Sequence, residues 1–342
     1  MRPFSYSKPE SVAEAIEMAA ELSDAETPPT RSRAQFIAGA TNLADYMKLG
    51  VAAPELLIEL NGLSDPALRR IDVSDEGIRF GALVRMSEAA DDETVKRHYP
   101  VIAESLKFAA SGQIRNAATL AGNILQRPRC EYFRDISWPC NRRSPGSGCA
   151  AMEGINRQHA VLGTSEHCIA TYHGDFAQAL IALGATVEIE GPGGTRQLSF
   201  SRLHRLPADT PDIETNLAPD EIITGISVPA GPWTQRSRYL KVRDRESYAF
   251  ALASAAVALQ LSQDTVQESR IALGGVATIP WRARQAEDAL RGRRLDEDAA
   301  HAAAEAAFAG SRPRGGNAFK VPLGKRTLVR ALLEARDMRI ST

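Results

Sequence analysis

The chain of 342 residues contains four cysteines, and all of them lie between positions 130 and 168. They are Cys130, Cys140, Cys149 and Cys168, separated by nine, eight and eighteen residues. Thiolate is a soft ligand that suits zinc and iron–sulfur clusters, and four thiolates complete the ligand set of one cluster. The surrounding segment is rich in Arg, Pro and Gly, which is typical of a loop-like insertion. We therefore expect a metal site there.

Disulfides and structural zinc are the alternatives. Disulfides belong mainly to small secreted domains, whereas this chain is long enough to bury its own core, and no apolar signal-peptide segment is seen near its start. Structural zinc usually takes closely spaced pairs such as C-x₂₋₄-C, and the sequence contains no C-x-x-C. The spacing therefore favours an iron–sulfur cluster over zinc, and either metal over disulfides.

Two turns rich in small residues could bind phosphate. The first, Ala-Gly-Ala-Thr-Asn-Leu at 38–43, joins a predicted strand to a predicted helix. Small side chains let backbone N–H groups approach a phosphate, and a helix N-terminus adds a favourable dipole. Alone, this turn is explained at least as well by backbone geometry, because tight turns often need Gly. A second turn, Thr-Leu-Ala-Gly-Asn-Ile at 119–124, has the same character, so the two could hold opposite sides of one pyrophosphate.

The elements that position these residues follow from the spacing of apolar side chains. A capping box at Ser11 and Glu14 predicts a helix, and buried-strand patterns at 34–38 and 55–60 complete a compact α/β unit. Further along, the patterns predict strands at 69–73, 78–83, 186–190 and 221–229, and helices at 86–96, 101–110 and 175–183.

The last third of the chain changes character. Three strand patterns come first and three helix patterns follow, which indicates an α+β layer domain. The strands are expected at 237–242, 251–261 and 266–276, and the helices at 283–290, 296–308 and 324–333.

Composition excludes some classes of function. The formal net charge of -1 gives no global basic field, so nucleic acid is not an expected partner. No run of 18 or more apolar residues occurs, so we expect no membrane span. The hydrophobic content of 44% and charged content of 24% are ordinary for a globular protein. The length suggests two or three domains.

The two small-residue turns resemble those of the flavin-binding subunits of the molybdenum hydroxylases, the family of xanthine dehydrogenase and carbon monoxide dehydrogenase. In that family an AGGT-N-L-type turn and a T-[LI]-x-G-N turn hold the diphosphate of FAD. This chain has Ala40 where the family often has a second Gly; Ala permits close backbone approach but disfavours positive φ. The resemblance runs essentially end to end and includes Phe4-Ser5-Tyr6, Glu221-Ile222-Ile223, Lys241-Val242-Arg243, Ser247-Tyr248-Ala249, Gly274-Gly275-Val276-Ala277 and Pro280-Trp281-Arg282.

The resemblance implies an α+β fold in three parts. Residues 1–60 and 61–230 would form the two subdomains of an FAD-binding PCMH-type unit, similar to vanillyl-alcohol oxidase, with an iron–sulfur insertion at 126–170. Residues 231–342 would form a C-terminal α+β domain of the CO dehydrogenase flavoprotein type, with a three-stranded antiparallel sheet and helices.

The resemblance also implies the residues that bind FAD. Asp175 would hold the ribityl or adjoining hydroxyls, and Ile223 and Lys241 would lie near the isoalloxazine. Each also has a purely structural explanation as a helix cap, a core residue or a strand residue, which is the stronger one for Ile223 and Lys241. No catalytic proton-transfer residue is assigned. The turn residues implied are Ile37, Ala38, Gly39, Ala40, Thr41, Asn42, Leu43, Thr119, Gly122 and Asn123.

The cysteine segment narrows the resemblance to the flavin subunit of bacterial periplasmic aldehyde oxidoreductases, which carries an additional [4Fe–4S] cluster on four such cysteines. The subunit of 4-hydroxybenzoyl-CoA reductase also carries an extra cluster, but its insertion is placed differently. The arginines of the segment would offset the charge of a cluster or form a solvated face. Because four cysteines leave no vacancy, we interpret His159, His167 and His173 as structural or interface residues.

The function implied is electron transfer. A flavin exchanges electrons in pairs or singly, whereas a cluster moves one at a time. Aldehyde oxidation would occur on a large molybdenum-cofactor subunit, and electrons would pass through a small [2Fe–2S] subunit to FAD in this chain and on to an external acceptor, in a heterotrimer. The alternatives are the flavin subunit of a 4-hydroxybenzoyl-CoA reductase-like or xanthine dehydrogenase-like complex, a zinc-stapled assembly scaffold, and a stand-alone flavin oxidase. We expect cytoplasmic synthesis without a signal peptide of its own, and co-export to the periplasm with a partner is a hypothesis.

Overall fold

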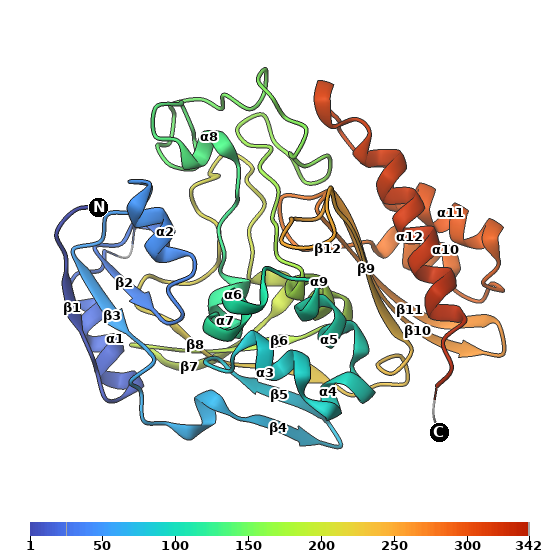
Figure 1. Cartoon of the computed structure of the whole chain (residues 1–342), viewed down its shortest axis with the longest axis horizontal. Coiled ribbons are helices and arrows are strands. Elements are labelled where there is room, and N and C mark those ends of the chain that lie inside the picture. Colours follow the sequence, from blue (N-terminus) through green and yellow to red (C-terminus); the bar gives the residue numbers. More distant parts are fainter. Residues whose placement is uncertain (25, 341–342) are drawn as a thin grey trace.

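The structure is a computed structural model that describes residues 1–24 and 26–340. Within these residues the strands form three sheets of three, five and four strands, one after another along the chain. In Figure 1 the three-stranded sheet lies at the left, the five-stranded sheet below the centre and the four-stranded sheet at the right. The cysteine segment rises above the centre of the molecule.

The first unit is a parallel sheet in the order β1-β3-β2. The Ser11 side chain caps α1 by accepting a hydrogen bond from Glu14 N at 3.2 Å, while the Glu14 carboxylate accepts one from Glu10 N at 2.7 Å. The capped helix buries Ala15, Ile16 and Ala19 against the sheet. Its elements are β1 (Ser5–Ser7), α1 (Val12–Ala20), a 3₁₀ turn (Pro29–Arg31), β2 (Ala34–Ile37), α2 (Leu43–Lys48) and β3 (Leu56–Glu59).

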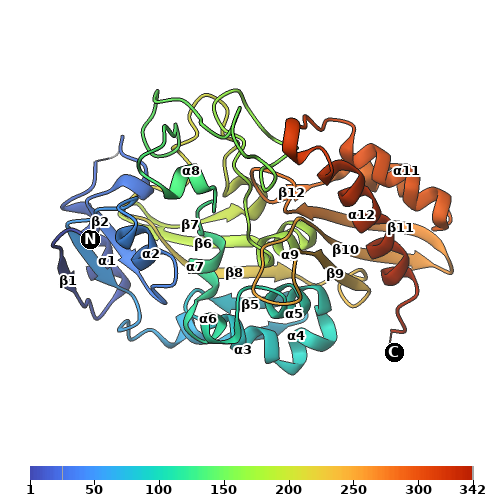
Figure 2. The ribbon, with the colours of Figure 1, turned by 45° about the horizontal axis from the view of Figure 1, so that its top comes forward.

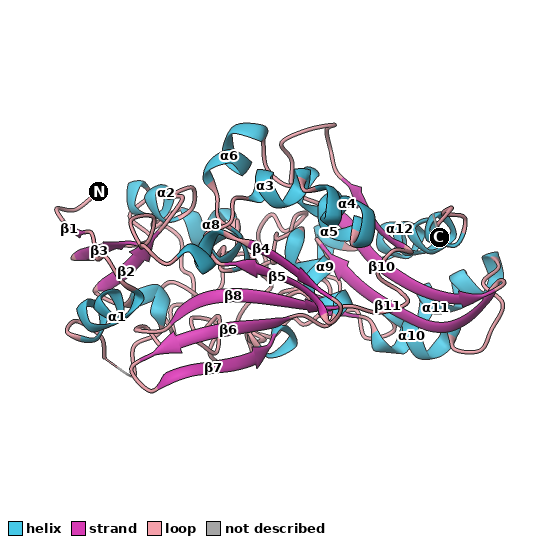
Figure 3. Ribbon diagram, turned by 90° about the horizontal axis from the view of Figure 1, so that it is seen from below, coloured by secondary structure: helices cyan, strands magenta, loops and turns pink. Residues whose placement is uncertain are grey.

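The second unit is an antiparallel sheet in the order β4-β5-β8-β6-β7. Figure 3 shows the helices α3 to α6 on one side of this sheet. Its strands are β4 (Ile71–Ser74), β5 (Gly77–Gly81), β6 (Thr186–Gly191), β7 (Gly194–Ser199) and β8 (Ile222–Pro229). Its helices are α3 (Met86–Asp91), α4 (Glu93–His98), α5 (Pro100–Lys107), α6 (Gly112–Ala117), α7 (Leu120–Ile124) and α9 (Phe176–Leu183), with 3₁₀ turns at Pro66–Arg69 and Phe200–Arg202.

The helix predicted at 86–96 is two helices. Asp92 lies between α3 and α4 in an extended conformation, and its carboxylate accepts a hydrogen bond from Val95 N at 2.9 Å. This side chain caps α4 and interrupts the helical hydrogen-bond ladder. Strand β7 was not predicted, because it is an edge strand with only Leu198 buried and lacks apolar alternation.

The third unit contains a four-stranded antiparallel sheet in the order β12-β11-β10-β9, so the prediction of three strands was wrong. The missing strand is the two-residue β12, too short for a periodicity, which pairs with the end of β11. Helices α10 to α12 cover one face, and α5 and α9 contact the other. The elements are β9 (Ser237–Val242), β10 (Ala253–Ser262), β11 (Thr265–Gly274), β12 (Trp281–Arg282), α10 (Arg284–Leu290), α11 (Glu297–Phe308), a 3₁₀ turn (Gly315–Asn317) and α12 (Lys320–Arg336).

Helix α9 joins the second and third units. All eight of its residues are buried, and it contacts β8 of the five-stranded sheet and β10 and β11 of the four-stranded sheet. Figure 2 shows it between the two sheets. An element buried on every side holds its first residues rigidly, which is what a ligand-binding side chain at its start requires.

The segment at 126–170 is largely irregular. Its one regular helix among the described residues is α8 (Glu131–Arg134), and a single bridge pairs Cys140 with Cys149. In Figure 1 this segment lies between α2 and the start of α12. Among the described residues, no helix combines the length and the hydropathy needed to cross a bilayer.

Candidate functional site

The two small-residue turns are in contact. The first leads from the end of β2 at Ile37 to the start of α2 at Leu43. The second begins at Thr119, whose hydroxyl caps α7 by accepting a hydrogen bond from Gly122 N at 3.2 Å. Gly39 packs directly on the backbone that enters the second turn, where a Cβ atom would overlap the carbonyl oxygen of Ala117. Only glycine fits at this contact.

Ala40 occupies the left-handed region of backbone conformation, with φ of 57°. This region is unfavourable for a residue with a Cβ atom, by roughly 1–2 kcal/mol. The turn therefore has the geometry that glycine would satisfy without strain, even though the chain carries alanine there. Such stored strain is common where a backbone is shaped for a ligand.

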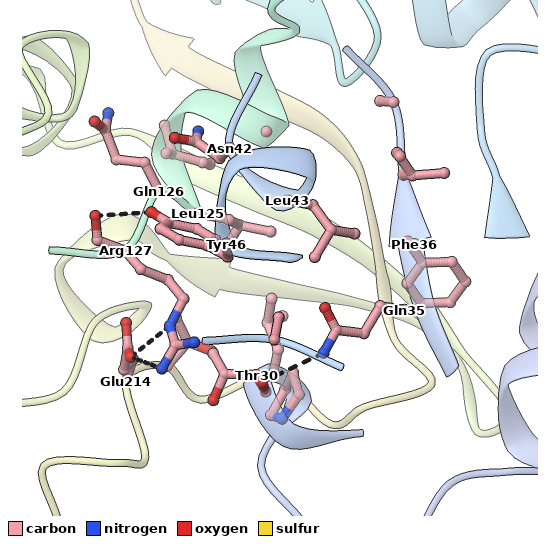
Figure 4. Close-up of a pocket in the computed structure, with 18 of the residues that line it drawn as sticks. Thr30, Gln35, Phe36, Asn42, Leu43, Tyr46, Leu125, Gln126, Arg127 and Glu214 are labelled. Atoms are coloured by element: carbon pink, nitrogen blue, oxygen red, sulfur yellow. Dashed lines mark hydrogen bonds and ion pairs between the residues drawn. The ribbon is translucent and has the colours of Figure 1, made fainter. Parts of the chain in front are cut away.

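Two cavities flank the turns. The smaller, of about 240 Å³, is lined by every residue from Ile37 to Leu43 and by Thr119 and Gly122. Figure 4 shows Tyr46, Arg127 and Glu214 on its other wall. The larger, of about 910 Å³, is lined by Asn123, Asp175 and parts of the cysteine segment within 126–134 and 155–159. The residues that line both cavities are Thr41, Asn42, Ala118 and Gln126, so the turns stand at their junction.

The residues at this junction fit a dinucleotide diphosphate. No carboxylate belongs to either turn. Asn123 Oδ1 is buried and has no hydrogen-bond partner among the described residues, which leaves an acceptor for a bound hydroxyl. Arg129 donates hydrogen bonds to Asn42 and to Asp45 at 2.8 Å, so it brings a positive charge to the rim. A diphosphate at the junction would leave one cavity for each half of the ligand.

Asp175 reaches the larger cavity from the start of α9, and its carboxylate is already paired. Lys241 Nζ donates to Oδ2 at 2.8 Å and the Tyr239 hydroxyl donates to Oδ1 at 2.5 Å. Burial raises the pKa of Asp175 above its ordinary value, and Lys241 and Tyr239 only partly oppose this. Lys241 lies behind Asp175, also donates to Phe108 O at 2.9 Å, and does not line either cavity.

Ile223 lies in the hydrophobic core of the second unit. It is 4% exposed within the hydrophobic core and lines neither cavity. The reason is its place in β8, the central strand of the five-stranded sheet, where side chains at this position face the helices that cover the sheet. Its predicted position near the isoalloxazine stays a prediction, and the burial of Ile223 fits the alternative role of a core residue.

The four cysteines line one further, enclosed cavity. All four are free thiols; Cys149 is half-buried and the others are buried. Burial raises the pKa of Cys130 to about 12, so its thiolate form requires a cation or a metal. Among the residues that the structure describes, no three Cys, His, Asp or Glu side chains converge on a point that could hold a single metal ion.

Two side chains contact the cysteine sulfurs. His159 Nε2 lies 3.2 Å from Cys130 Sγ, and Arg142 Nη2 lies 3.7 Å from Cys168 Sγ. Burial lowers the pKa of His159 to about 4. From the sequence His159 is expected only to be a structural or interface residue, because no local signal indicates its contact with Cys130, which lies 29 positions away.

A buried ion-pair group ties the cysteine segment to the smaller cavity. Glu214 contacts Arg127 at 2.8 Å and Arg142 at 3.4 Å, and each of the three side chains is at most 10% exposed. Burial raises the pKa of Glu214, but the two guanidinium groups outweigh this effect and hold it below its ordinary value. Arg142 lines both the smaller cavity and the cysteine cavity. Sequence reasoning missed Glu214, because no motif surrounds it.

Two protein-family models together match almost the whole chain. The FAD binding domain in molybdopterin dehydrogenase matches residues 2–231. The CO dehydrogenase flavoprotein C-terminal domain matches residues 238–335. The first match covers more than half of the chain and contains both turns, Asp175 and the four cysteines.

Individual relatives agree with these matches. The aldehyde oxidoreductase FAD-binding subunit PaoB of Escherichia coli K12 is 46% identical over 98% of this chain and 99% of its own length. The carbon monoxide dehydrogenase medium chain of Hydrogenophaga pseudoflava is 28% identical over 96% of each chain. A solved structure of carbon monoxide dehydrogenase from that organism superposes with a TM-score of 0.73, covering 98% of this chain and 97% of the other, at 28% identity. The chain therefore belongs to the family of FAD-binding medium subunits of the molybdenum hydroxylases.

Proposed function

We propose that this chain is the electron-transfer subunit of a molybdenum-dependent aldehyde oxidoreductase, with FAD and a [4Fe–4S] cluster. The observation that carries the proposal is the arrangement of the three cavities. The two turns stand at the junction of two of them, and four cysteines surround a third that shares Cys130 with the larger cavity.

The FAD site follows from this arrangement. The turns at 37–43 and 119–123 would receive the diphosphate at the junction, where Gly39 allows close backbone approach. Asp175 would accept hydrogen bonds from hydroxyl groups of the ligand in the larger cavity, while Lys241 and Tyr239 hold its carboxylate in place. When bound, FAD exchanges electrons in pairs or singly. The protein's part is to bind, orient and shield it.

The cysteine cavity suits a cluster better than zinc. Structural zinc usually takes closely spaced cysteine pairs, and the sequence contains no C-x-x-C. The thiolates of a [4Fe–4S] cluster hold a multi-iron group together, so their sulfurs belong around the walls of a cavity. Arg142, whose Nη2 lies 3.7 Å from Cys168 Sγ, would offset part of the cluster's negative charge.

The proposed substrate class and the proposed partner subunits rest on the similarity of this chain to known proteins. The relative with 46% identity is named as the FAD-binding subunit of an aldehyde oxidoreductase. By analogy this chain would assemble with a large molybdenum-cofactor subunit and a small [2Fe–2S] subunit, receive electrons from the small subunit and deliver them to an external acceptor. The proposal includes export of the folded complex to the periplasm with a partner that carries the signal. Recovery of the complex only from the cytoplasmic fraction would contradict that part.

An anaerobic reduction experiment tests the electron-transfer role. Adding an aldehyde to the purified complex should bleach the flavin absorption, and adding an acceptor should restore it. The isolated chain should show no bleaching with the same aldehyde, because aldehyde oxidation occurs on the partner. Bleaching of the isolated chain at the same rate would instead indicate a flavin enzyme that oxidises its own substrate.

A further inference from the structure

One cysteine differs from the other three in its surroundings. Cys130 lines both the cysteine cavity and the larger cavity, whereas Cys140, Cys149 and Cys168 line only the cysteine cavity. His159 also lines the larger cavity, and its Nε2 atom lies 3.2 Å from Cys130 Sγ. Cys130, with His159 beside it, therefore lies between the proposed cluster and the proposed flavin site.

The chemistry of ligation fixes the direction of the hydrogen bond in this pair. A cysteine that binds iron does so as a thiolate, which has no proton to donate. The imidazole must then carry its proton on Nε2 and donate it to the sulfur. The other ring nitrogen, Nδ1, is buried without a hydrogen-bond partner among the described residues, which suits it to remain unprotonated.

The backbone around His159 is held by the C-terminal domain. His159 is 5% exposed, and its carbonyl accepts a hydrogen bond from Asn317 Nδ2 at 3.4 Å. On one side Asn156 Oδ1 accepts from Gly316 N at 3.0 Å, and on the other the Gln158 carbonyl accepts from the buried Lys320 Nζ at 3.0 Å. The imidazole therefore sits on a rigid support that comes from a distant part of the chain.

We infer that His159 is the positioning residue of the cluster ligand nearest the flavin. Its Nε2–H group donates a hydrogen bond to the Cys130 thiolate, holds that ligand at the wall of the larger cavity, and raises the reduction potential of the cluster. Hydrogen bonds to ligating sulfurs favour the reduced, more negative state of a cluster. The inference rests on the proposed function, because it requires the [4Fe–4S] cluster and FAD.

A redox titration followed by electron paramagnetic resonance tests this role in the anaerobically purified complex. His159→Phe removes the donor but keeps a ring of similar size, and His159→Gln keeps an N–H group that can reach the sulfur. His167→Gln is the matched control: it replaces the neighbour of Cys168, whose ring pairs with Asp209 at 3.4 Å. Iron and FAD are counted in every sample.

His159→Phe should retain iron and shift the one-electron equilibrium about tenfold toward the oxidised cluster, equivalent to about 59 mV. His159→Gln should lie closer to the unmodified protein, and His167→Gln should not differ from it. Loss of iron in His159→Phe alone, with His159→Gln intact, would also support the hydrogen bond.

An unchanged potential in iron-loaded His159→Phe would overturn the inference while leaving the proposed function standing. Loss of iron in both His159 variants would overturn it too, because the donor would then not be the property that matters. Unmodified complex that contains FAD but no iron would instead overturn the cluster itself, and the inference with it.

Discussion

At the residue scale, the site depends on backbone positions where the presence or absence of a Cβ atom decides whether the residue fits its surroundings. Gly39 has no room for a Cβ atom, because the backbone of the second turn lies against it. Ala40, one position on, has a Cβ atom in a conformation that disfavours it. The first turn thus combines an obligatory glycine with a strained alanine. We therefore expect a substitution at Gly39 to be harmful and the substitution of Ala40 by glycine to be favourable.

Ala40→Gly should stabilise the protein by about 1 kcal/mol, because glycine adopts positive φ without a steric penalty. Urea unfolding of the FAD-loaded chain measures this. Ala44→Gly, within α2, is the matched control and should destabilise by about 1 kcal/mol. Equal destabilisation by both substitutions would show that Ala40 is not strained.

Gly39→Ala should weaken FAD binding at least about tenfold, since separating the two turns by even a small shift costs more than about 1.4 kcal/mol. Flavin fluorescence during rebinding to the cofactor-stripped chain measures the affinity. Gly193→Ala is the control, because a Cβ atom there meets nothing within 4 Å. Unchanged affinity in Gly39→Ala would remove the first turn from the binding site.

At the element scale, the cysteine segment is irregular, so side chains rather than backbone ladders fix it. Arg127 and Arg142 anchor it to Glu214, which lies after the five-stranded sheet's edge strand β7. Arg142 also reaches Cys168 Sγ. One buried carboxylate therefore supports both the cysteine cavity and a wall of the smaller cavity.

Glu214→Gln should destabilise the protein at pH 7 by about 3–5 kcal/mol, because two buried guanidinium groups lose their counter-charge. The folded-state pKa of Glu214 lies below its ordinary value of 4.5. Its stabilising effect is therefore present above pH 4.5 and is lost as the pH falls through the folded-state pKa.

Urea unfolding from pH 7 down to pH 3 should accordingly show the unmodified protein approaching Glu214→Gln in stability at the acidic end. Glu55→Gln, at an exposed pair with Arg33, should follow the unmodified protein throughout. A difference between Glu214→Gln and the unmodified protein that stayed constant with pH would contradict the account of this ion-pair group.

Elements with strong periodicity were predictable from the sequence, and those defined by tertiary contacts were not. β9 lies at its predicted bounds, since Tyr239, Leu240 and Val242 are residue types that favour strands, whereas the exposed edge strand β7 was missed. The two turns were found because their residues are contiguous. Glu214 contacts Arg127, 87 positions away, and His159 contacts Cys130, 29 positions away. The residues next to Glu214 and His159 in the sequence form no pattern that predicts these contacts. The role of Ile223 stays a prediction, because a family position does not show which way a strand residue faces.

At the scale of the whole molecule, the proposed flavin site lies where the region matched by the FAD-binding domain meets the region matched by the C-terminal domain. Asp175 begins α9, and its partners Tyr239 and Lys241 come from β9. The Lys241 and Asp175 side chains are 1% and 5% exposed. This buried group joins the two regions and orients a carboxylate toward the larger cavity.

Lys241→Met should destabilise the chain by about 3–5 kcal/mol, because Asp175 would keep a buried charge without a cation. The double variant Asp175→Asn with Lys241→Met should recover much of this stability, since neither charge then remains. Urea unfolding of the FAD-free chain separates this effect from cofactor binding. Additive losses in the double variant would contradict a direct pairing.

The central claim is that one chain holds FAD and a four-iron cluster at a shared wall. The most direct measurement is the content of FAD, iron, labile sulfide and zinc in anaerobically purified protein and in its Cys149→Ser variant. The account predicts one FAD and about four irons with matching sulfide per unmodified chain, and loss of that iron in Cys149→Ser. Zinc in place of iron, or iron that survives in Cys149→Ser at the full amount, would contradict it.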